Sequence, residues 1–100
     1  MERLNLTTCT KDELEERITR AIKKIKNGML YIAFGSKYNE VKDQVLYLSR
    51  EGWEIGTMAS LEINNGECVD IINHMEEYDY KSTFRWLIND LYNYIKYEYQ

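Results

Sequence analysis

The residue types with the most obvious potential for chemistry gather between positions 73 and 79. His74 is the only histidine of the 100-residue sequence, and Glu76, Glu77 and Asp79 follow it closely. One imidazole and three carboxylates can bind a divalent cation, but a zinc site also needs a second histidine or a cysteine at a characteristic spacing. The segment contains neither. We therefore interpret it as a solvated acidic connection, and we predict no metal and no cofactor.

Nucleophilic catalysis needs a base placed next to the nucleophile. The two cysteines, Cys9 and Cys68, are too few for a disulfide framework, and we expect them to be reduced. No spacing places His74 beside either thiol or beside a serine. Glu54 and Glu62 lie on one face of a predicted strand, where carboxylates are usually solvated rather than catalytic. We therefore predict that the protein is not an enzyme.

A group of basic residues occupies the first predicted helix. Arg17, Arg20 and Lys24 form a stripe, and Lys23 and Lys26 lie nearby. Such a stripe can bind phosphate, but Glu13 and Glu16 each precede an arginine by four residues, the spacing of a helical ion pair. Bases near the end of a helix also offset its dipole. We favour a solvated face over an anion site.

Two large aromatic residues lie off the apolar face of the last predicted helix. Trp86 and Tyr97 share a stripe with Asp90 and Asn93 at helical spacing. Tryptophan and tyrosine are enriched at the centres of protein interfaces. The stripe is therefore either a partner-binding surface or a face covered by another helix of the same protein, and the sequence leaves both open.

These residues must be positioned by six predicted elements. Thr10 and Glu13 form a capping box that starts the first helix, which Gly28 ends. Apolar periodicity predicts helices over 10–27 and 37–51 and a last helix that starts near 79–82 and continues almost to the end of the sequence. It predicts strands over 29–34, 53–63 and 67–73.

The turn between the last two predicted strands permits two pairings. A two-residue turn at Asn65 and Gly66 places Asp70 opposite Leu61 and brings a carboxylate to the buried face. A three-residue loop places Val69 opposite Leu61 instead. Because an apolar pair suits the buried face, we predict the three-residue loop.

The predicted fold class is α+β, in one domain over residues 1–100. We expect a three-stranded, mostly antiparallel sheet in the order helix, strand, helix, strand, strand, helix. The 67–73 strand is expected at the centre, paired with both other strands. The helix at 37–51 would then cover one face of the sheet by a right-handed crossover, and one or both terminal helices would cover the other face.

Charge and hydropathy exclude several partners. Residues 1–50 carry ten Lys and Arg against seven Asp and Glu, a net +3, whereas residues 51–100 carry three against ten, a net −7. This acidic balance disfavours direct binding of nucleic acid, which requires clustered cations. No apolar run approaches the roughly 20 residues that span a membrane, and we expect a cytoplasmic protein with no membrane contact.

The segment Glu51-Gly52-Trp53-Glu54-Ile55 resembles the helix-to-strand junction of a small bacterial and phage βαββ domain of unknown function. That junction reads Glu-Gly-Trp-Glu-Leu in the family. The resemblance extends over residues 29–73 in element order. It implies a βαββ core, and it supplies no functional residues because the family has no assigned chemistry.

Together these features predict a small interaction protein, plausibly encoded by a phage or mobile element, that binds and inhibits or modulates a host protein. Such a host partner could act in defence, as for an anti-CRISPR, or in handling nucleic acid. The predicted partner-binding residues are Trp86, Asp90, Tyr97, Glu76, Glu77 and Asp79. An acidic surface with aromatic anchors can dock into a basic groove. The alternative is a βαββ module that binds a small ligand or forms a homodimer.

Overall fold

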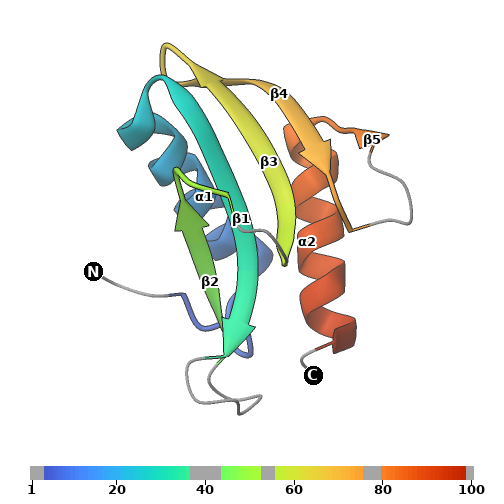
Figure 1. The fold of residues 1–100 in the computed structure, drawn as a ribbon. Coiled ribbons are helices and arrows are strands. Elements are labelled where there is room, and N and C mark those ends of the chain that lie inside the picture. Colours follow the sequence, from blue (N-terminus) through green and yellow to red (C-terminus); the bar gives the residue numbers. More distant parts are fainter. Residues whose placement is uncertain (1–3, 37–43, 53–55, 76–79, 99–100) are drawn as a thin grey trace.

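The computed structural model describes residues 4–36, 44–52, 56–75 and 80–98 (Figure 1). Its elements in chain order are α1 (Lys11–Ile25), β1 (Gly28–Ser36), β2 (Gln44–Ser49), β3 (Thr57–Asn64), β4 (Glu67–Asn73), β5 (Tyr80–Lys81) and α2 (Phe84–Glu98). The strands form one sheet in the order β2-β1-β3-β4-β5, with antiparallel neighbours throughout. The predicted α+β class is confirmed, but the sheet has more strands than predicted.

The predicted helix over 37–51 is wrong where it can be compared, because Gln44–Ser49 forms strand β2. Leu46 and Leu48, two residues apart, face Phe34 and Ile32 of β1 and turn their side chains to the core. The apolar spacing fits a helix and a strand almost equally over so short a segment. The open edge of β1 decides between them, because a paired strand satisfies backbone groups on both sides. Residues 37–43 lie outside the described residues.

The predicted central strand is also wrong. β1 pairs with β3 and not with β4, and Leu30 faces Leu61 across this pair. β3 therefore lies in the middle of the sheet, where three of its side chains, Ala59, Leu61 and Ile63, are buried. Because β1 has antiparallel neighbours on both edges, the sheet needs no crossover helix.

The β3–β4 turn is shorter than predicted. Asn64 faces Glu67, so the turn has two residues, and both Asn65 (φ 52°) and Gly66 (φ 76°) adopt positive φ. This conformation suits the twist of a hairpin, and asparagine and glycine tolerate it best. The predicted three-residue loop is therefore wrong.

A bulge in β4 keeps the apolar residues on the buried face despite the shorter turn. Ile63 faces Cys68, whereas Glu62 faces Asp70, so Val69 is an extra residue on the β4 side. Beyond the bulge Leu61 faces Ile71 in the core, not Val69 as predicted. Val69 itself is 55% exposed.

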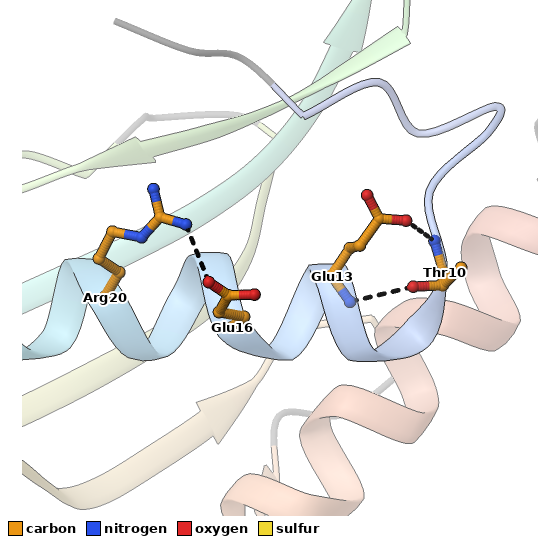
Figure 2. Close-up of polar contacts among 4 residues, drawn as sticks. All are labelled: Thr10, Glu13, Glu16 and Arg20. Atoms are coloured by element: carbon orange, nitrogen blue, oxygen red, sulfur yellow. Dashed lines mark hydrogen bonds and ion pairs between the residues drawn. The ribbon is translucent and has the colours of Figure 1, made fainter.

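Helix α1 begins as the sequence predicts. The Thr10 side chain accepts a hydrogen bond from the Glu13 amide at 3.1 Å, and the Glu13 carboxylate accepts one from the Thr10 amide at 3.0 Å. Figure 2 shows this capping box and, one turn further along, the 3.2 Å ion pair between Arg20 and Glu16. The box satisfies backbone donors that the first turn leaves unpaired.

The other end of α1 is fastened to the β3–β4 turn. The Gly66 amide donates to the Lys26 carbonyl at 2.9 Å, and the Asn65 amide donates to Asn27 Oδ1 at 3.1 Å. Both bonds join residues that are far apart in sequence. They fix the position of the turn relative to the helix.

Helices α1 and α2 lie side by side on one face of the sheet (Figure 1). They share one core with the inward side chains of β1, β2, β3 and β4. The buried helical residues are Leu14, Ile18, Ile22, Leu87, Ile88, Leu91 and Ile95. No helix of the described segments covers the opposite face, which carries Tyr31, Ser60 and Glu62. No helix in the described part of the chain is long and apolar enough to cross a membrane.

The bulge predicts different effects for two neighbouring substitutions in β4. Ile71→Ala should lower the free energy of unfolding by about 2–5 kcal/mol, because it leaves a cavity opposite Leu61. Val69→Ala should change it by no more than about 0.5 kcal/mol, because this side chain is largely solvated. Urea denaturation of both variants checks the prediction. A larger loss for Val69→Ala would instead support the pairing predicted from sequence.

Candidate functional site

The outer face of α2 exposes the two aromatic residues of the predicted stripe. Trp86 is 64% exposed and Tyr97 is 85% exposed, so the other described elements do not cover them. The opposite face of the helix is buried in the core. Tyr97 follows Trp86 by eleven positions, which corresponds to about 16 Å along the helix. Their spacing allows them to act as two separate anchors on one surface.

Asp90 belongs to the same stripe but makes a contact inside the protein. Its Oδ2 accepts a hydrogen bond from Asn73 Nδ2 at 3.0 Å, and Asn73 is 0% exposed at the end of β4. Asn73 Oδ1 in turn accepts a bond from the Met75 amide at 2.9 Å. A buried amide without partners is costly, so Asp90 stabilises the junction between α2 and the sheet. Its predicted role in partner binding stays a prediction.

The three other predicted partner-binding residues, Glu76, Glu77 and Asp79, lie outside the described residues. His74, which precedes them, is described, and its backbone amide donates to the Met58 carbonyl at 2.8 Å. Within the described segments no group of three or more His, Cys, Asp or Glu side chains is placed to bind a metal ion.

Sequence reasoning missed a side-chain contact of His74. Its Nε2 lies 2.8 Å from Ser60 Oγ of β3, on the sheet face opposite the helices. A serine next to an imidazole is the first requirement of a nucleophilic site, but it also occurs as an ordinary hydrogen bond between strands. Neither of the two clefts described below contains this pair. No sequence spacing predicts the contact, because it depends on how β3 and β4 are aligned.

Both thiols are poor nucleophiles at neutral pH. Burial raises the pKa of Cys9 above its ordinary value, and the nearby Glu13 carboxylate raises it further. Burial likewise raises the pKa of Cys68. The thiolate is the reactive form, so these environments favour the unreactive one.

The basic residues in α1 and directly after it divide between two clefts. Lys23 and Lys26 line an open cleft of about 520 Å³ beside the β3–β4 turn, which also includes Glu67. Arg17, Arg20 and Lys24 line a second cleft, of about 390 Å³, between α1 and the β1–β2 pair. The three residues of the predicted stripe therefore line one cleft together, and the two nearby lysines line the other.

The second cleft, which we call the α1–β2 cleft, gains a cation that the sequence did not indicate. Arg50 follows β2 and reaches the end of α1, where its guanidinium donates to the Ile25 carbonyl at 3.4 Å. The pairing of β2 with β1 therefore brings Arg50 to the α1 cations.

Comparison with family models, with curated proteins and with solved structures found no significant match for this chain. The resemblance of residues 29–73 to the βαββ domain therefore stays untested, and Trp53, Glu54 and Ile55 of its junction lie outside the described residues. Function must be inferred from the surfaces of this protein alone.

The Asn73–Asp90 bond leads to a prediction about stability. Asp90→Ala removes an acceptor from a buried amide and should lower the free energy of unfolding by about 1–3 kcal/mol. Asp90→Asn keeps an acceptor oxygen and should cost less. Asn93→Ala, at an exposed position on the same helix, serves as the control. Equal melting temperatures for Asp90→Ala and Asn93→Ala would contradict the structural role.

The Ser60–His74 contact allows a direct test for catalysis. We expect p-nitrophenyl acetate hydrolysis to be the same for the wild-type protein and Ser60→Ala, because the imidazole of His74 can account for slow background hydrolysis without a nucleophilic serine. His74→Gln should remove that background. A burst of p-nitrophenol that disappears in Ser60→Ala would instead show an acyl-enzyme, and the protein would then be an enzyme.

Proposed function

We propose that this protein is a small, non-enzymatic interaction module that binds another protein through the outer face of α2. The observation that carries this proposal is the exposure of Trp86 and Tyr97. Three large apolar side chains are exposed among the described residues, and two of them lie on this helix. Aromatic side chains that become buried on binding contribute much of the energy of protein interfaces.

The geometry of α2 favours recognition by a rigid surface. The buried side of the helix is anchored by four core residues, and Asp90 ties its middle to Asn73. The two exposed aromatics are therefore carried on a fixed backbone, and ordering them on binding costs little conformational entropy.

Charge indicates the kind of partner. The half of the sequence that contains α2 has a net charge of −7, and the carboxylates of residues 76–79 come shortly before the helix in the chain. A partner with a basic groove would be attracted at long range, and the aromatics would then slow its release. A host protein that handles nucleic acid, bound by a protein of a phage or mobile element, fits this description and is part of the proposal.

A homodimer formed through the same face of α2 is the competing function. It would bury both aromatics in a symmetric interface. Sedimentation velocity distinguishes it, because a dimer that becomes a monomer in Trp86→Ala would place the interface between two copies of this chain.

The proposal predicts that the aromatic substitutions weaken partner binding without unfolding the protein. Trp86→Ala and Tyr97→Ala should each reduce affinity by about thirtyfold, which corresponds to a loss of about 2 kcal/mol. Quantitative capture from lysates of candidate hosts, followed by titration of the recovered partner, provides the measurement. Arg85→Ala, an exposed neighbour on another side of the helix, is the matched control. Partners retained at full strength by both aromatic variants would rule out this interface.

A further inference from the structure

The α1–β2 cleft has the composition of a ligand site and lies apart from the proposed interface. It is lined by Arg17, Arg20, Ala21, Lys24, Ile25, Leu30, Leu48, Ser49 and Arg50. Four of these residues are cations, and none is an aspartate or glutamate. We propose that this cleft binds a small amphipathic anion, whose apolar body lies on the cleft floor and whose carboxylate or phosphate is held by the surrounding cations.

The floor of the cleft is apolar and comes from three elements. Ala21 and Ile25 belong to α1, Leu30 to β1 and Leu48 to β2. Leu30 is fully buried, whereas the other three are only half-buried and pack against the core. Apolar surface therefore remains accessible in the cleft, and a ligand that covers it would gain free energy by removing that surface from water.

The cations reach the cleft from two directions. Arg17, Arg20 and Lys24 lie along one side of α1, at spacings of three and four residues. Arg50 comes from the end of β2. Guanidinium groups present paired donors that match the oxygens of a carboxylate or phosphate. A headgroup at this end of the cleft could therefore receive donors from two elements at once.

The contacts that Arg20 and Arg50 make leave the charge of these two residues available. Arg20 pairs with Glu16, but the two side chains are 61% and 71% exposed, and such a pair contributes little. Arg50 donates to a neutral carbonyl, which leaves its positive charge uncompensated by that bond.

Stabilisation of the helix dipole does not account for the whole group. That effect acts within the last turn of a helix, and α1 ends at Ile25. Lys24 lies in this turn, whereas Arg17 and Arg20 lie before it. Arg50 belongs to another element, although its bond to the Ile25 carbonyl does cap the helix. The helix dipole therefore does not explain why several cations surround an apolar cleft floor.

Size and net charge favour a small ligand over a polymer. The cleft volume of about 390 Å³ falls at the lower end of the range for small-molecule sites, about 300–1,000 Å³. The protein as a whole carries a net charge of −4, so a long polyanion extending beyond the cleft would be repelled. A single anionic group with an apolar body meets both constraints.

Two dyes of nearly the same shape test the proposal. 1-Anilinonaphthalene-8-sulfonate carries one sulfonate, and N-phenyl-1-naphthylamine is the same ring system without the charge. We expect the sulfonate to bind saturably at one site and at least about tenfold more tightly than the neutral dye, with affinity falling as salt is added. Equal affinity of the two dyes, or no saturable binding, would overturn the proposal.

Matched variants locate the bound dye. Lys24→Gln and Arg50→Gln should each weaken sulfonate binding at least about threefold, whereas Lys23→Gln removes the same charge from the neighbouring cleft and should leave it unchanged. Trp86→Ala should also bind normally, so this site and the α2 interface can fail independently. Equal effects of Lys23→Gln and Lys24→Gln, or loss of binding in Trp86→Ala, would refute the assignment.

Competition establishes the source of the anion. Dodecanoate below its micellar concentration should displace the dye, and vesicles of phosphatidylglycerol should not sediment with the protein. Sedimentation with these vesicles would indicate a membrane surface and overturn the small-molecule proposal. Thermal melts check that every variant is folded. If Arg50→Gln does not fold, the binding measured for Lys24→Gln tests the proposal.

Discussion

The pairing of β1 along both of its edges is the constraint on which the rest of the structure depends. At Ile32 the strand faces Leu48 of β2 on one side and Ala59 of β3 on the other. A strand paired on both edges satisfies its backbone groups within the sheet and contributes a continuous row of side chains to the core. The sheet can then be built from antiparallel neighbours, and both helices are free to pack on the same face.

That arrangement also creates the two surfaces to which we assign function. β2 ends beside the last turn of α1, so Arg50 joins the cations of the helix over a floor formed by β1 and β2. α2 packs through one side only, so Trp86 and Tyr97 remain in solvent. The positive charge of the first half of the sequence thus borders a cleft, and the second half, which is strongly acidic, carries the exposed aromatics.

The features predicted correctly from sequence are those that depend on nearby residues. Thr10 and Glu13 form their capping box within one turn, and the apolar spacing of α2 places Leu87 and Leu91 inward and Trp86 outward. The errors concern contacts that only the assembled sheet defines. The segment containing Leu48 forms a strand because it can pair with the free edge of β1. The local sequence pattern contains no information about this pairing.

The candidate site shows the same division. Helix periodicity predicts that the aromatic stripe points away from the core, but whether another element covers it depends on the assembled structure. The contact of Asp90 with Asn73 and that of Ser60 with His74 likewise require the position of β4 relative to its neighbours. The bulge at Val69 shifts that position by one residue. A single extra residue therefore determines which polar side chains meet, although the alternating pattern of the strand gives no sign of it.

The two bonds between the β3–β4 turn and the end of α1 have a consequence for how the chain folds. They link Asn65 and Gly66 to residues almost forty positions earlier, so they can form only after the hairpin has the correct alignment. A hairpin that slipped by one residue would expose its apolar face and would also lose both bonds. The first helix and the hairpin should therefore open together in native-state hydrogen exchange, as one cooperative unit. This unit can form only when the two strands are correctly aligned.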